Sequence, residues 1–195
     1  GAALIDRFLA PPRGAGAWTA DAVRLLGLLG VLAAFLWWAP GDGGIVALSM
    51  LALVVPRFAG VRPGFDIAFC VTVLVAAWSN VLDRYESVAV WDLVVHVVCT
   101  GMLAAMAYVV LARLGIVPVP LADGTRRATP VVLVTVLGLA LSAVWEMLEW
   151  AGRTLIAPDI FVTYQDTIGD MAAGGLGAVV AGFVVSRVGL LTDRG

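Results

Sequence analysis

Residues 88–114 read VAVWDLVVHVVCTGMLAAMAYVVLARL, and this stretch decides the fold of the chain. Its charged side chains are Asp92 near the start and Arg113 near the end, and His96 follows Asp92 by four residues. A helix of about 20 apolar residues crosses the roughly 30 Å hydrocarbon core of a bilayer. The stretch is therefore long and apolar enough to form a membrane-spanning helix.

The rest of the chain has the same character. Hydrophobic residues make up 62% of the 195 residues and charged residues 13%, whereas soluble domains average about half and about a quarter. With a mean hydropathy of +1.01, too few polar residues remain to coat a water-soluble globule. Further apolar segments cover residues 22–39, 44–55, 65–82, 130–151 and 167–191. The sequence predicts an all-α protein, a polytopic transmembrane helix bundle with six spans.

Two segments, residues 1–20 and 44–55, differ from the other predicted spans. Residues 1–20 combine an apolar cluster with Pro11 and Pro12, which predicts a short interfacial segment ahead of a single six-helix domain over residues 21–195. Residues 44–55 are short for a span and end at Pro56, which is also typical of a re-entrant or kinked segment.

Arginine placement favours six full crossings. All twelve basic residues are arginines, and short cytoplasmic loops carry the excess of positive charge. With both termini inside, ten arginines fall on the inner side, and Arg84 and Arg153 fall outside. If residues 44–55 did not cross, the split would be five inside against seven outside. We therefore expect a multi-pass protein of the cytoplasmic membrane with both termini in the cytoplasm.

Polar residues inside the predicted spans occur in three pairs. Each pair has a spacing of three or four residues, which places both side chains on one helix face. The pairs are Asp92 with His96, Glu146 with Glu149, and Asp166 with Asp170. The predicted topology puts all three near the outer ends of the last three spans, so the sequence predicts one extracytoplasmic site.

Five carboxylates so close together need compensating positive charge. The sequence offers Arg84, Arg153, protons or a bound cation as the source. Oxygen ligands with one imidazole suit Zn²⁺, Mn²⁺ or Fe²⁺, as a single ion or a pair. The predicted metal ligands are Asp92, His96, Glu146, Glu149, Asp166 and Asp170, with Glu146 or Glu149 also the catalytic general base.

Structural interpretations of the same residues stay open. Asp166 is equally typical of a helix N-cap, and Asp92 and Asp170 suit the positive end of a helix dipole. The trio of His96, Glu146 and Glu149 is compatible with buried structural hydrogen bonds, although an ionisable group in the membrane is costly and usually functional.

Small residues follow one another at helical spacing in the last span, from Ala173 to Gly182. Such ladders allow helices to approach closely, either within the bundle or in a dimer. We expect membrane lipids and no nucleic acid as partners, with a homodimer through the last helix or association with another membrane protein as further expectations.

The three pairs, followed by a Gly/Ala-rich helix, resemble the bacterial inner-membrane family typified by YjdF and, more distantly, the VanZ-like proteins. The likeness covers roughly residues 65–191. One departure is residues 161–165, FVTYQ, where the family has Gly-Thr-Gln-Gly-Asp. The resemblance implies a multi-span membrane protein and supports the site without supplying a reaction.

Three functions are compatible with these features. The first is a metal-dependent hydrolase or transferase acting on a lipid or lipid-linked headgroup at the outer interface. The second is a cation- or proton-coupled transporter, against which stands the lack of ionisable residues between His96 and Arg113 and between Pro130 and Glu146. The third is an accessory subunit in which the polar cluster fixes helix packing.

Overall fold

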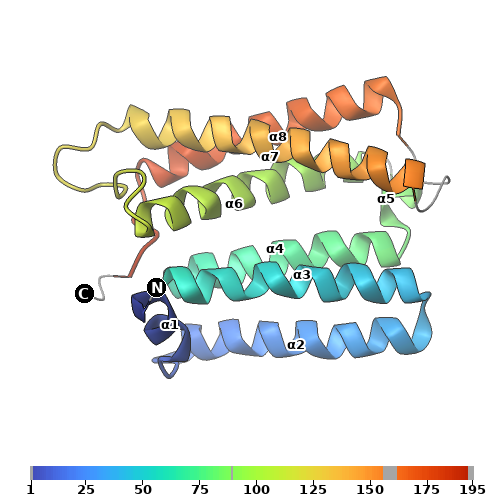
Figure 1. Ribbon diagram of the computed structural model, residues 1–195, viewed down its shortest axis with the longest axis horizontal. Coiled ribbons are helices and arrows are strands. Elements are labelled where there is room, and N and C mark those ends of the chain that lie inside the picture. The colour runs from blue at the N-terminus through green and yellow to red at the C-terminus, as the bar shows by residue number, and fades with distance from the viewer. Residues whose placement is uncertain (1, 89, 156–161, 193–195) are drawn as a thin grey trace. The chain divides into compact units, whose positions relative to one another are not determined.

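The structure of the protein is a computed structural model that describes residues 2–88, 90–155 and 162–192. The regular secondary structure of the described residues consists of helices, with no strand, and six of the helices are long and apolar enough to cross a membrane (Figure 1). This confirms the predicted fold class. The chain divides into two compact units, Gly1–Ala89 with Leu190–Gly195, and Val90–Gly189.

The first unit is built from three long helices, α2 (Ala15–Trp37), α3 (Pro40–Ala59) and α4 (Pro63–Val81), which pack on one another. The short helix α1 (Ala2–Leu9) packs on α3, and α5 (Arg84–Ser87) follows α4. Helix α2 begins before residue 20, inside the stretch that we expected to be interfacial. Helix α3 continues through Pro56, so it is 20 residues long rather than the 12 expected from residues 44–55.

Four charged side chains lie inside the first unit and pair with one another. The Nη2 of Arg24 on α2 is 2.5 Å from Oδ1 of Asp66 on α4, and its Nη1 is 3.1 Å from Oδ1 of Asp21. Arg57 on α3 pairs with the same Asp21. Arg24 Nε also donates to the carbonyl of Leu53, at 2.8 Å. These charges balance, as burial in an apolar bundle requires.

The second unit contains α6 (Trp91–Arg113), α7 (Ala128–Leu155) and α8 (Tyr164–Val185), and α8 packs on both of the other helices. Glycines permit the close approach: a Cβ at Gly101 would lie 2.8 Å from the carbonyl oxygen of Gly177, and a Cβ at Gly182 would lie 2.9 Å from the Val131 backbone. The small-residue ladder of α8 is thus used for packing inside the unit.

Gly177 is the tightest of these contacts, because a Cβ there would overlap the backbone carbonyl of Val97. We expect Gly177→Ala to lower the free energy of unfolding by about 1–3 kcal/mol, since a backbone atom cannot move aside as a flexible side chain does. The matched control is Gly169→Ala in the same helix, whose Cβ would meet only Leu93, at 3.9 Å. Denaturant unfolding in mixed micelles checks this, and equal stability of the two variants would contradict the packing described.

Candidate metal centre

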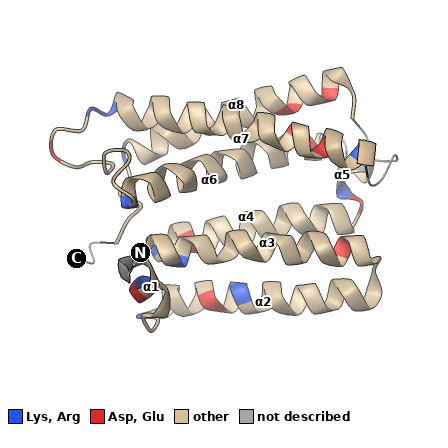
Figure 2. Ribbon diagram, viewed as in Figure 1, with Lys and Arg blue, Asp and Glu red and all other residues tan. Residues whose placement is uncertain are grey.

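Helix ends place the predicted site residues at one end of the second unit. Asp92 lies in the first turn of α6, Asp166 in the first turn of α8, and Glu149 near the end of α7. Because α6 and α8 begin where α7 ends, their polar turns share one end of the bundle, where Figure 2 shows the acidic positions of α7 and α8. The N-cap of α8 is Thr163, whose Oγ1 accepts a hydrogen bond from Asp166 N at 3.3 Å, so Asp166 is not the cap.

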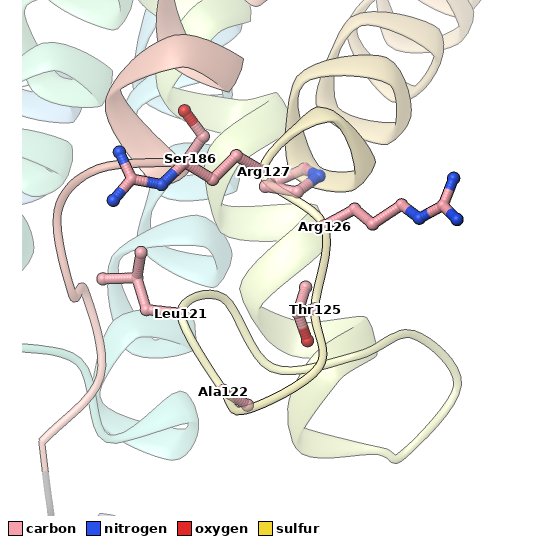
Figure 3. Close-up of a pocket in the computed structure, with 7 residues that line it drawn as sticks. Leu121, Ala122, Thr125, Arg126, Arg127 and Ser186 are labelled. Atoms are coloured by element: carbon pink, nitrogen blue, oxygen red, sulfur yellow. The ribbon is translucent and has the colours of Figure 1, made fainter.

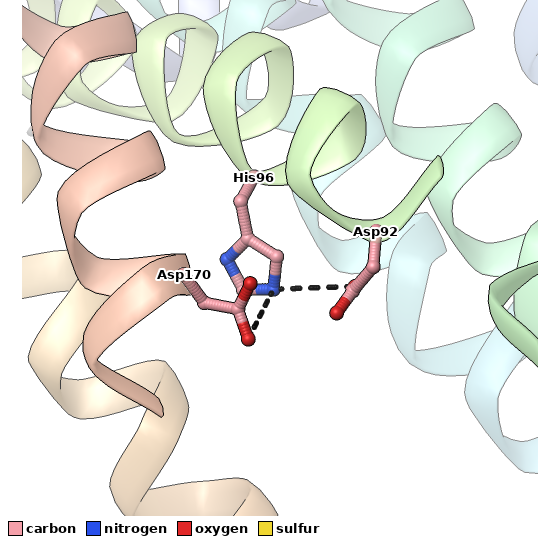
Figure 4. A group of neighbouring side chains, drawn as sticks. All are labelled: Asp92, His96 and Asp170. Atoms are coloured by element: carbon pink, nitrogen blue, oxygen red, sulfur yellow. Dashed lines mark ion pairs between the residues drawn. The ribbon is translucent and has the colours of Figure 1, made fainter. Parts of the chain in front are cut away.

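Asp92, His96 and Asp170 converge from two helices (Figure 4). His96 Nε2 is 3.5 Å from Asp92 Oδ1 and 3.9 Å from Asp170 Oδ2. One ligand atom from each of the three residues lies within 4.8 Å of the others. His96 and Asp170 are buried, whereas the Asp92 side chain is 37% exposed and forms the open edge of the group.

The distances within the group are longer than ordinary hydrogen bonds. Ordinary N–H···O bonds measure about 2.7–3.2 Å, shorter than both distances from His96 Nε2. Ligand atoms about 2.0–2.1 Å from a tetrahedral Zn²⁺ stand ~3.3 Å apart. To reach that spacing His96 and Asp92 would approach by about 0.2 Å, and His96 and Asp170 by about 0.6 Å. The three residues form a group that could hold a metal ion.

Glu146 is the second observation that points to a cation. Only 5% of the residue is exposed. Neither carboxylate oxygen has a partner in strict hydrogen-bond geometry among the described residues, and the Thr167 side chain is the hydroxyl that interacts with it. Its electrostatic neighbours include His96, Asp166 and Asp92, so it faces the same group. A buried carboxylate is normally paired, protonated or bound to a metal. The site thus contains a buried carboxylate that forms no ion pair with an arginine in the part of the chain that the structure describes.

Glu149 and Asp166 stand at the margin of the group. Trp145 Nε1 donates a hydrogen bond to Glu149 Oε1, at 2.7 Å. Glu149 interacts electrostatically with Glu146 and His96, and Asp166 interacts with Asp92 and His96. All six predicted residues are therefore brought to one end of the unit. Only Asp92, His96 and Asp170 have ligand atoms in mutual reach.

The second unit offers one nearby arginine, and it is engaged elsewhere. Arg153 Nη1 donates to the backbone carbonyl of Val162. In residues 90–155 and 162–189, no ion pair joins an arginine to a carboxylate of the group. Within this unit, protons or a bound cation are left to compensate the carboxylates.

The polar group continues one turn deeper, at residues that the sequence analysis did not assign to the site. A Cβ at Gly174 would lie 2.6 Å from Ser142 Oγ and 3.0 Å from Thr100 Oγ1. Ser142 is buried and its hydroxyl has no hydrogen-bond partner among the described residues. Thr100 follows His96 by four residues and Gly174 follows Asp170 by four. The same spacing that revealed the pairs could have found them.

Comparison with known proteins places the chain in a family. Residues 22–189 match the family model described as "Predicted membrane protein (DUF2238)". The chain belongs to the DUF2238 family. The match covers the five spans from α3 to α8 completely and most of α2, so the six candidate spans are a feature of the family region. Neither the curated proteins nor the solved structures gave a match.

Proposed function

We propose that this DUF2238 protein is a metal-dependent membrane enzyme, a hydrolase or transferase that acts on a lipid or lipid-linked headgroup at the extracytoplasmic face of the cytoplasmic membrane. The observation that carries the proposal is the buried Glu146, which forms no ion pair with an arginine among the described residues, beside the convergent Asp92, His96 and Asp170. We also propose that the chain is related to the family typified by YjdF and, more distantly, to the VanZ-like proteins.

Each residue has a role that its surroundings support. Asp92, His96 and Asp170 hold the cation, which when bound supplies Lewis acidity toward a phosphoryl or acyl oxygen. Glu146 is the general base of the proposal: it is buried beside the three ligands, and the Thr167 side chain is the neutral group that interacts with its carboxylate. Glu149 and Asp166 add negative charge at the margin and complete the cation-binding group.

A lipid substrate is supported by the position of the group. It lies at helix ends, where a span meets the headgroup layer, and its open edge is the exposed Asp92. The nearby Trp145 and Trp150 are 52% and 61% exposed, as expected of an interfacial aromatic belt. We expect a headgroup to reach the group at this edge.

The close helix packing below the polar group favours an enzyme over a transporter. Below Thr100 and Ser142, a Cβ at Gly138 would overlap Ala178 and lie 3.3 Å from Ala104 Cβ. Such close packing of α6, α7 and α8 favours a site that opens at one end of the unit.

Glu146→Gln tests the catalytic role. We expect this variant to retain the metal and to lose about 10²–10⁴-fold in rate, the usual contribution of a general base. The assay incubates the Zn²⁺- or Mn²⁺-loaded protein with vesicles of phosphatidylethanolamine and phosphatidylglycerol, and mass spectrometry follows released headgroups and acyl chains. The control Glu149→Gln alters the marginal carboxylate and is expected to lose less than about 10-fold. Turnover by Glu146→Gln equal to that of the wild type would contradict the assignment.

A further inference from the structure

The end of the second unit opposite the metal centre carries a different cavity. It has a volume of about 160 Å³, enough for about five waters at ~30 Å³ each and hence for a phosphate group. The loop between α6 and α7, the start of α7 and the end of α8 form its walls (Figure 3). Arg126, Arg127, Thr125 and Ser186 provide its polar lining.

The two arginines that line this cavity, Arg126 and Arg127, are available to bind an anion. Both are exposed, and among the described residues neither side chain is paired with a carboxylate or engaged in a hydrogen bond. Figure 3 shows Arg127 extending beside Ser186, while Arg126 points away from it. Arg187, one residue after Ser186, adds a third guanidinium at the same end of the unit, where Figure 2 shows basic positions.

The loop that closes the cavity is held in place. Tyr108 Oη donates to the carbonyl of Pro118, at 2.8 Å, and so fastens the loop to α6. Leu121, which lines the cavity, has a φ of 64°, a left-handed conformation that is costly for a bulky side chain. The loop beside the cavity is therefore tied to α6 by the Tyr108 hydrogen bond.

An apolar hollow lies beside the arginines on the outer surface of α7. It has a volume of about 320 Å³ and is lined by Ala128, Thr129, Val132 and Leu133. Val132 is 58% exposed, and Val136 one turn further along α7 is 57% exposed. This apolar stripe of α7 starts at the two arginines. The arrangement suits a lipid whose headgroup lies at the arginines and whose acyl chain lies along the helix.

We infer that the cavity at Arg126 and Arg127 binds the phosphodiester headgroup of an anionic membrane lipid. Arg127 supplies charge-assisted hydrogen bonds to the phosphate oxygens. The hydroxyls of Thr125 and Ser186 donate to the backbone carbonyls of Val119 and Phe183, so they contribute polar walls to the cavity. Basic pockets between spans on the cytoplasmic side are suited to such headgroups. This site is independent of the metal centre at the other end of the unit.

The test uses the full chain in phosphatidylcholine micelles, titrated with short-chain phosphatidylglycerol and followed by native mass spectrometry. An arginine near an anionic lipid surface contributes about fivefold in binding. We therefore expect Arg127→Gln to weaken binding about fivefold, and Arg126→Gln, whose side chain points away from the cavity, to weaken it less than Arg127→Gln does. Arg153→Gln, a control with the same charge change at the other end of α7, is expected to bind like the wild type.

Two further arms separate this site from unspecific attraction. Ala122→Leu fills the cavity without changing charge and is expected to weaken binding by a similar fivefold. Millimolar inorganic phosphate is expected to displace little lipid, because it lacks the acyl chain. The proposal is overturned if Arg153→Gln weakens binding as much as Arg127→Gln, if Ala122→Leu has no effect, or if inorganic phosphate competes fully.

Discussion

His96→Ala is expected to lower the affinity of the protein for Zn²⁺ or Mn²⁺ by more than about 100-fold. His96 is the residue through which the other two ligands meet, because both ion-pair distances, 3.5 Å and 3.9 Å, start at its Nε2. Replacing a residue that only hydrogen-bonds to a metal ligand already lowers metal affinity about 10–100-fold. Replacing a ligand itself is therefore expected to lower it more. Calorimetric titration of metal-free protein in detergent gives the affinity directly.

Cys99→Ala is the matched control for this prediction. Cys99 lies on the same helix, less than one turn from His96, but it does not share the group of ligand atoms formed by Asp92, His96 and Asp170. Its replacement is expected to leave the affinity unchanged. Equal affinities of His96→Ala and the wild type, or a loss seen only for Cys99→Ala, would show that the metal binds elsewhere.

Arg24→Met is expected to lower the free energy of unfolding by about 3–5 kcal/mol, the usual cost of removing one partner of a buried ion pair. Arg24 compensates Asp66 on α4, and both side chains are only 12% exposed. Without Arg24, Asp66 keeps its burial and loses its positive partner. Asp21 retains Arg57, so the effect is concentrated at Asp66. Unfolding in mixed micelles, followed by circular dichroism, measures the change.

The double variant Arg24→Met with Asp66→Leu separates an unpaired charge from lost packing. It removes both members of the pair and leaves Asp21 with Arg57, so it is expected to recover more than half of the lost stability. A single variant that costs less than about 1 kcal/mol would contradict the buried pair. A double variant no more stable than the single one would assign the cost to packing around Arg24.

Most of the fold is predictable from the sequence, because the length of each hydrophobic segment is a local property. The exception at residues 44–55 has a physical reason. Pro56 disfavours a helix in isolation, but here it is buried inside α3. The helix ends at Ala59, and its C-cap residue Gly60 has a left-handed conformation. Tertiary packing offsets the lost backbone hydrogen bond, and the sequence alone does not reveal that packing.

That the candidate site residues gather in one place is also predictable from the sequence. Helical spacing and a common helix end were enough to expect that Asp92, His96 and Asp170 meet. Spacing does not reveal which buried carboxylates lack an arginine partner among the described residues, and Glu146 emerged as one of them from the structure. The pairing of Arg24 with Asp66 joins residues 42 positions apart and had no local signal either.

The most direct test of the central claim is elemental analysis of the detergent-purified protein after dialysis against metal-free buffer, with Asp170→Asn beside the wild type. Asp170 is a buried ligand whose amide replacement keeps the side-chain size but loses the negative charge. The account predicts about one equivalent of a divalent transition metal in the wild type and less than about a tenth in the variant, in line with ligand loss. A wild type without metal that does not acquire it when Zn²⁺, Mn²⁺ or Fe²⁺ is added would contradict the account.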